Sequence, residues 1–172
     1  MRRVFPFMIC LMLCACATSY EDGLTSAKQW RAEGISVDAT AQARRDLFVG
    51  RWYDRQNARD GSQTMSLMEV KRDGTYVESW RTLEKDGRQR LSEEKGRWGV
   101  SGNIFFTITT ARAENGGLMV DVDQSNAYFY DAYSVENATQ NENTIRHIVN
   151  GDEFVSRRVD DDFSFPNFPS SK

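Results

Sequence analysis

The chain has 172 residues, a formal net charge of −3 and a single histidine. This length suits one domain with one hydrophobic core. A weakly acidic chain lacks the clustered basic face that nucleic acids require, which excludes nucleic acid as a partner.

The first fifteen residues have the layout of an export signal. Arg2 and Arg3 precede an apolar run over residues 4–13, which is too short to cross a bilayer as a stable helix. Residues 13–16 (Leu-Cys-Ala-Cys) end this run, and they resemble the lipobox of bacterial lipoproteins. The resemblance implies that the thiol of Cys16 is modified with lipid and that the chain is cut before Cys16. Cys16 would then carry acyl chains such as palmitate, and the membrane would be a partner held through that lipid.

The residues around the cleavage point predict where the protein resides. Its three cysteines, Cys10, Cys14 and Cys16, lie in or beside the signal, so the mature body has no second thiol for a disulfide or metal site. The residue after the cysteine is Ala17, whereas an aspartate there would resemble an inner-membrane retention signal. This difference favours an outer-membrane anchor facing the periplasm. Residues 15–17 (Ala-Cys-Ala) also fit an ordinary cleavage site, and this alternative predicts a soluble periplasmic or secreted protein.

The rest of the chain divides by composition. We expect a signal peptide at 1–15, a polar tether at 16–38, a β-barrel domain at 39–163 and a C-terminal tail at 164–172. Asp38 is placed to cap a short helix over residues 39–46. Three phenylalanines at the end of the chain, Phe163, Phe165 and Phe168, either fold back over the barrel or remain in a loose tail.

Short strands dominate the predicted domain. They are expected at residues 47–54, 64–71, 75–84, 88–95, 97–100, 104–110, 118–122, 127–135, 143–149 and 153–159. Asp-Gly and Asn-Gly pairs, which suit tight hairpins, separate many of them. A meander of this length must pair its edges. We therefore predict an all-β fold, a small antiparallel up-and-down β-barrel of about eight to ten strands with a short N-terminal helix. A bulge is expected near Leu67, because apolar residues change face there.

One sequence element suggests the floor of such a barrel. Gly50 and Trp52 belong to a Gly-Arg-Trp sequence that recurs at residues 96–98. The first copy resembles the G-x-W signature of lipocalins and the wider calycin group. The resemblance implies a lipocalin-like barrel in which the glycine packs closely, the tryptophan plugs the floor and an arginine from the last strand lies across the indole. Alternation in the last predicted strand points Arg157 inward, with Arg158 as the alternative.

Polar residues on otherwise apolar strand faces are the candidate ligand-binding residues. Glu78 lies between Tyr76 and Trp80, while Asp131 and His147 each lie between apolar residues. A charge buried in a barrel needs an ion pair, hydrogen bonds or a ligand. These residues therefore form either a pocket with an aromatic wall or a structural arrangement in which they face outward or pair with an arginine.

Enzymatic and metal chemistry find little support in the sequence. His147 is the only histidine, and no G-x-S-x-G element accompanies it. Soft-metal sites lack their cysteine and histidine ligands. We expect no enzyme activity, no metal and no cofactor.

The sequence leaves two functions open. The first is a membrane-anchored envelope protein whose barrel binds a small apolar or amphipathic molecule. The second is a module that binds an envelope protein as an inhibitor or assembly factor, using its outer surface around a filled core.

Overall fold

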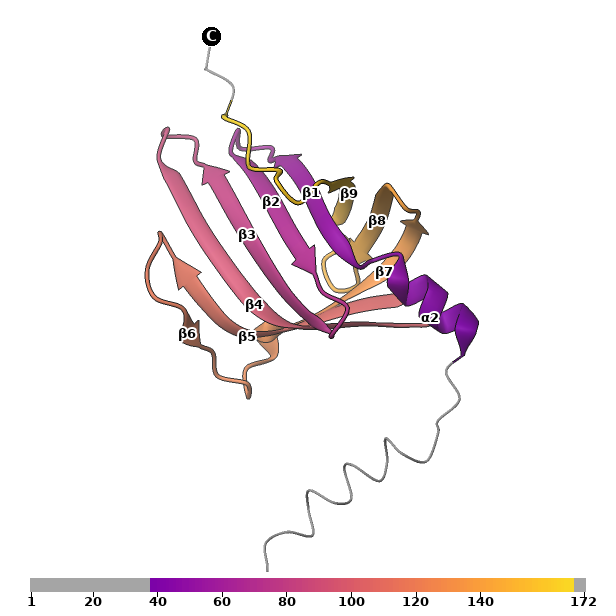
Figure 1. The fold of residues 1–172 in the computed structure, drawn as a ribbon. Coiled ribbons are helices and arrows are strands. Elements are labelled where there is room, and N and C mark those ends of the chain that lie inside the picture. The colour runs from indigo at the N-terminus through magenta and orange to yellow at the C-terminus, as the bar shows by residue number, and fades with distance from the viewer. Residues whose placement is uncertain (1–37, 169–172) are drawn as a thin grey trace, which may run out of the picture. The chain divides into compact units, whose positions relative to one another are not determined.

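The computed structural model describes residues 38–168, which form the β-barrel drawn in Figure 1. The predicted signal (1–15), the lipid-attachment residue Cys16 and the predicted tether (16–38), apart from Asp38, lie outside the described residues. Within the described part, no helix is long and apolar enough to cross a membrane.

A short helix, α2 (Ala39–Asp46), begins where the sequence predicts. The Asp38 carboxylate accepts hydrogen bonds from the backbone nitrogens of Thr40 (2.8 Å) and Ala41 (3.2 Å). These bonds satisfy two of the amides that a helix leaves unpaired at its start. Two arginines in the last turn favour its C-terminal end.

Nine strands form one antiparallel sheet. They are β1 (Gly50–Asn57), β2 (Gln63–Val70), β3 (Thr75–Leu83), β4 (Gln89–Ser101), β5 (Ile104–Glu114), β6 (Val120–Asp121), β7 (Tyr130–Ala138), β8 (Glu142–His147) and β9 (Glu153–Val159), with a 3-10 turn, η1 (Ala127–Phe129), before β7. The strand order is β4-β3-β2-β1-β9-β8-β7-β5-β6, and β4 also pairs with β5. Eight strands therefore close into a barrel, and β6 lies outside this ring.

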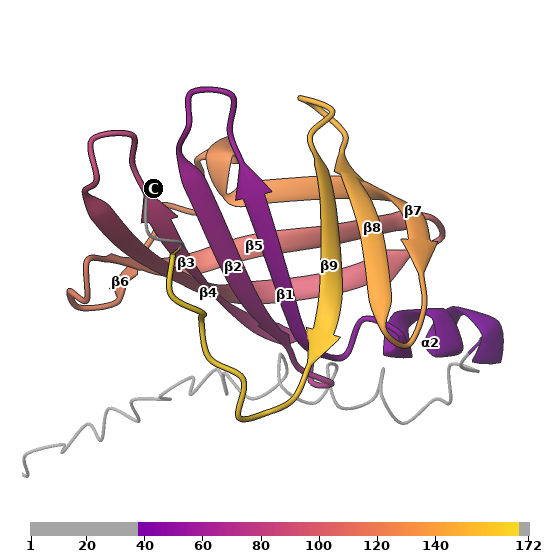
Figure 2. The ribbon, with the colours of Figure 1, turned by 90° about the horizontal axis from the view of Figure 1, so that it is seen from above.

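The closed arrangement confirms the predicted fold class, including the short N-terminal helix. In Figure 2, β5 lies behind β1 and β9, on the opposite wall of the barrel. Closure pairs the edges that an open meander would expose. The two strands expected at 88–95 and 97–100 are one continuous strand, β4.

The predicted bulge near Leu67 is wrong. β2 pairs with β1 and β3 without a shift in register. The shifts lie instead between Lys95 and Gly96 in β4 and between Val135 and Asn137 in β7. β2 carries apolar residues on both faces because both are covered: Met68 faces the interior, and Met65 is fully buried on the outer face.

The C-terminal segment lies across that outer face, as one of the two predicted arrangements requires. Phe163 packs on Tyr53 of β1 with ring centroids 5.0 Å apart. The Arg81 guanidinium of β3 lies 5.9 Å from the ring centroid of Phe165 and 5.4 Å from that of Phe168. Residues 160–168 therefore form a strap over β1–β3 (Figures 1 and 2).

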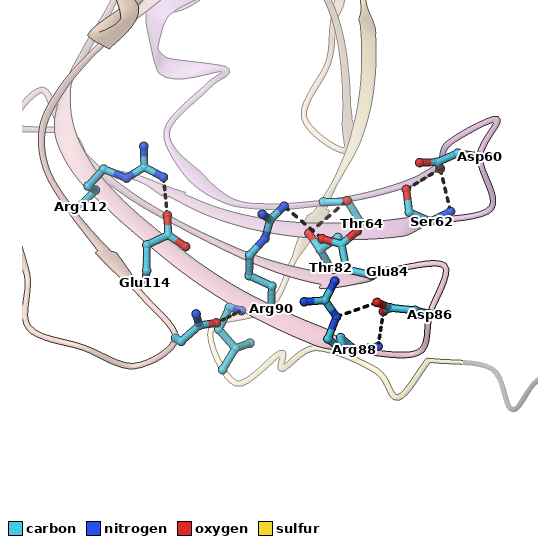
Figure 3. Close-up of polar contacts among 12 residues, drawn as sticks. Asp60, Ser62, Thr64, Thr82, Glu84, Asp86, Arg88, Arg90, Arg112 and Glu114 are labelled. Carbon is cyan, nitrogen blue, oxygen red and sulfur yellow. Dashed lines mark hydrogen bonds and ion pairs between the residues drawn. The ribbon is translucent and has the colours of Figure 1, made fainter.

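Three successive hairpins share one kind of turn, formed around an Asp-Gly pair. Figure 3 shows two of them: Asp60 accepts hydrogen bonds from the nitrogen (2.9 Å) and hydroxyl (2.7 Å) of Ser62, and Asp86 accepts one from the Arg88 nitrogen (3.0 Å). The glycine after each aspartate has a positive φ of 84–91° (Gly61, Gly74 and Gly87). Glycine adopts this conformation without steric cost, so these pairs fix where the strands reverse.

One end of the barrel, here called the floor, is closed. Helix α2 lies there, with Arg45 donating to the Arg72 carbonyl (3.1 Å) in the β2–β3 turn. The Arg45 guanidinium also covers the Trp98 ring at 4.4 Å. The main core cluster contains Phe48, Trp52, Val70, Tyr76, Trp98, Phe105 and Val135. The opposite end, called the open end, carries η1 and the β8–β9 turn.

Candidate functional site

The barrel encloses a cavity of about 210 Å³. Six aromatic residues contribute to its wall: Phe48, Trp52, Trp80, Phe105, Tyr133 and Phe154. Its polar groups are Asp54, Ser66, Glu78, Thr107, Asn143 and Ser156. A mainly aromatic wall with a few polar groups is typical of small-molecule sites, because apolar contacts give affinity and polar contacts give orientation.

A second hollow of about 450 Å³, here called the vestibule, adjoins this cavity. Trp80, Tyr133 and Phe154 line both hollows. The vestibule also includes residues of η1 and Asn150 of the β8–β9 turn, which places it at the open end. The vestibule therefore lies between the cavity and solvent, with three aromatic side chains at their junction.

Glu78 and Asp54 are the acidic groups of the inner cavity. Burial raises the pKa of Glu78 to about 8; Ser66 provides a hydrogen bond that opposes the shift, while the charges of Glu94, Asp54 and Asp131 reinforce it. Asp54 is only 7% exposed, and burial also raises its pKa. A protein interior disfavours the charged form of a carboxyl group, so Glu78 is largely protonated at neutral pH.

The predicted site residue Tyr76 lines neither hollow. It is 2% exposed, and its hydroxyl lies 2.8 Å from Thr109 Oγ1. Thr109 in turn donates to Glu94 Oε2 (2.9 Å), so Tyr76 donates to Thr109 and the three form a chain. Glu94 lines the vestibule, and burial raises its pKa. Tyr76 thus belongs to the core cluster beneath the cavity and is linked to the vestibule through Thr109.

Asp131 and His147, two further predicted site residues, both line the vestibule. His147 Nε2 lies 3.2 Å from Asp131 Oδ1, and His147 Nδ1 accepts a hydrogen bond from the Asn150 nitrogen (3.3 Å). Because Nδ1 is the acceptor, Nε2 carries the proton shared with Asp131. Both ring nitrogens therefore have partners within the protein, Asp131 and the Asn150 backbone.

The prediction that Arg157 lies across Trp52 is wrong; Arg158 takes this place. The Arg158 guanidinium is 4.3 Å from the Trp52 ring centroid, and these two residues are cross-strand partners. Arg157 points to the outer face, 5.0 Å from the Tyr53 ring centroid and 5.2 Å from that of Phe163. Alternation alone identifies two faces but not which is inside, and here Phe154 and Ser156 share the inner face with Arg158.

Gly50 has the close packing that the G-x-W resemblance implies. Its φ is +136°, and a Cβ atom there would overlap the Arg158 guanidinium. Arg158 donates to the carbonyls of Val49 (2.6 Å) and Leu47 (2.9 Å), and Trp52 Nε1 donates to the Phe48 carbonyl (2.7 Å). These bonds close the floor and leave the space above Trp52 for the cavity.

Sequence reasoning missed Asp54, although a signal was present. Side chains two positions apart in a strand share a face, so an inward Trp52 implies an inward Asp54. Phe154 and Ser156 were missed because the last strand was assigned the opposite face. Within residues 38–168, no group of three or more His, Cys, Asp or Glu side chains could hold a metal ion.

The chain matches no protein-family model and no curated protein. Among solved structures, it is similar to a lipocalin-like protein from Bacteroides uniformis ATCC 8492, with 16% identity and a TM-score of 0.40, over 66% of this chain and 99% of the other. It is also similar to a de novo designed fluorescence-activating β-barrel, with 18% identity and a TM-score of 0.37, over 72% of this chain and all of that one. The fold of this chain is therefore assigned from its own strand pairing.

Proposed function

We propose that this barrel binds a small amphipathic molecule in its interior and holds it at the cell envelope. The observation that carries the proposal is the cavity of about 210 Å³ beneath a wider vestibule. A cavity of about 150 Å³ in another protein is large enough for benzene. The aromatic wall suits the apolar part of a ligand, and Asp54 and Glu78 suit its polar part.

The location is proposed from the sequence. Export and lipidation at Cys16 would hold the barrel at a membrane, since two or more acyl chains anchor a protein stably. A barrel beside a membrane could shield an amphipathic molecule from water. The rival function, binding of an envelope protein by the outer surface, assumes a filled core. The cavity of about 210 Å³ is an argument against a filled core.

Native mass spectrometry of the full chain purified from its own host tests the proposal. We expect a reproducible additional mass that is lost on denaturation. An environment-sensitive dye should also enter the cavity and be displaced by the native ligand. A bare chain that also fails to bind any such dye would contradict the proposal.

Two neighbouring substitutions in β9 provide a matched control for the dye experiment. Ser156 lines the cavity, so Ser156→Phe should fill it and abolish dye binding. Val155 is on the outer face and 47% exposed, so Val155→Phe should preserve binding. Equal binding by both variants would place the dye elsewhere.

A further inference from the structure

Resting on the proposed function, we propose that the cavity selects an organic cation: a protonated amine or quaternary ammonium group on an apolar body. The inference starts from Asp54, which lines the cavity and is only 7% exposed. It accepts a hydrogen bond from Gln56 Nε2 (3.2 Å). No Lys, Arg or His of residues 38–168 lies within ion-pair distance of it.

Glu78 is a second acidic residue that lines the same cavity. Ser66 is its hydrogen-bond partner, and the charged groups that act on it are three carboxylates. None of the ion pairs found in the described part of the chain includes Glu78. Two enclosed acids without a cation are costly to ionise, and a cationic ligand would remove that cost.

The charged groups around Glu78 leave the interior acidic. Asp54 contributes from β1, Glu94 from β4 and Asp131 from β7. Arg112 of β5 is already engaged, since it lies 3.9 Å from Glu94. His147 of β8 is the hydrogen-bond partner of Asp131 through Nε2 (3.2 Å) and accepts a bond at Nδ1. Uncharged polar and titratable groups complete the surroundings: Ser66 of β2, Tyr76 of β3, Thr107 and Thr109 of β5, Tyr133 of β7, and Asn143 of β8.

The floor arginine does not neutralise these acids. The Arg158 guanidinium of β9 lies against the Trp52 ring and donates to the Leu47 and Val49 carbonyls. It is therefore committed to the floor. The aromatic wall adds a second attraction, because ring faces attract ammonium groups and recognise quaternary ammonium ligands in aromatic cages.

The site does not suit a metal ion. A hard cation such as Ca²⁺ requires six to eight oxygen ligands at 2.3–2.6 Å. No three His, Cys, Asp or Glu side chains within residues 38–168 converge in this way. A bulky organic cation needs only a nearby negative charge and apolar contact, which this cavity provides.

The proposal predicts a pH dependence that a neutral ligand would not show. A cation binds best when Glu78 is ionised, so binding should release a proton at neutral pH. Because the pKa of Glu78 in the free protein is about 8, a permanent cation should bind about tenfold more tightly at pH 9 than at pH 7.

The test compares three probes of similar size by titration calorimetry. Benzyltrimethylammonium is cationic, neopentylbenzene is its neutral carbon analogue, and phenylmethanesulfonate is anionic. The full chain is used in non-ionic detergent, with a blank titration into detergent alone. We expect at least tenfold tighter binding of the cation than of the neutral analogue at pH 9, and weak binding of the anion. At pH 7, binding of the cation should also release a proton.

Variants identify the groups responsible. Glu78→Gln and Asp54→Asn should each reduce the preference for the cation, whereas Glu69→Gln, an exposed carboxyl on the same barrel, should retain it. Circular dichroism verifies that each variant is folded. If the cation has no advantage over the neutral analogue, or if both inner variants retain it, the charge inference is overturned while the binding cavity stands. If no probe binds and the native chain carries no extra mass, the proposed function fails as well.

Discussion

At the scale of single residues, Glu78 is a group whose burial opposes stability. Its pKa in the folded barrel is about 8, against about 4.3 for a free glutamate. Between these values the unfolded chain gives up a proton that the folded barrel retains. Ionisation of Glu78 therefore does not lower the free energy of unfolding below about pH 4.3. Above that pH, the free energy of unfolding falls by up to about 1.4 kcal/mol per pH unit until about pH 8. Such a cost is typical of groups retained for function.

Glu78→Gln should remove this decline. Gln has nearly the same shape and no charge, so wild type and variant should have similar unfolding free energies at pH 4. Above pH 8 the variant should be more stable by a few kcal/mol. Urea unfolding at several pH values measures the difference, and Glu69→Gln serves as the exposed control. Parallel pH profiles for wild type and Glu78→Gln would contradict the assigned burial.

Two adjacent arginines separate the inner from the outer face of β9. Arg158→Met leaves the Leu47 and Val49 carbonyls without their charged donor and should cost about 2–3 kcal/mol. Arg157 is exposed and lies against the aromatic pair on the outer face. Arg157→Met should therefore cost about 0.5–1 kcal/mol. Denaturant unfolding of both variants compares them, and the reverse order would contradict the facing of β9.

The sequence alone could not predict which of these two arginines faces the interior. A strand pattern establishes that Arg157 and Arg158 point to opposite faces. The inner face is set by the partner strand, where Trp52 pairs with Arg158. Val155 favoured the wrong choice because it looked like a core residue, yet it is 47% exposed. Register between distant strands is not contained in the local pattern of either one.

At the scale of elements, local signals determined much of the fold. The Asp38 cap and the Asp-Gly turns act within a few residues, so the sequence shows them directly. Asp54 could also have been placed in the interior, two positions after Trp52. The cavity itself could not be predicted, because it depends on how the wall side chains pack against one another.

The C-terminal strap should contribute to stability without entering the binding site. Phe163→Ala removes the ring that covers Tyr53, which is 7% exposed, and should cost about 2 kcal/mol because the ring is half-buried. Thermal unfolding measures this loss. Leu118→Ala is the control, because Leu118 is 89% exposed and should change little. Dye binding in the cavity should be unchanged in Phe163→Ala, and its loss would show that the strap shapes the interior.

At the scale of the whole molecule, the cavity and the proposed anchor are separate parts of the chain. The first strand of the barrel begins at Gly50, whereas the proposed lipid attachment is at Cys16. The residues that line the cavity come from β1–β3, β5 and β7–β9, together with Phe48 just before β1. Folding and ligand binding should therefore be independent of the lipid, and the lipid should determine only where the barrel is held.

Cys16→Ser tests this separation. Serine cannot accept the thioether-linked lipid that the lipobox resemblance implies, so we expect the variant to leave the mature membrane-anchored pool while its barrel still binds the cavity dye. Cys14→Ser is the matched control, because it changes a neighbouring cysteine that the resemblance does not make the lipid site. Membrane fractionation with mass measurement of the mature N-terminus follows both variants. A lipidated, membrane-bound Cys16→Ser protein would overturn the anchor. A released protein that no longer binds dye would show that the barrel depends on its attachment. The substitution itself lies well before the first strand, which begins at Gly50.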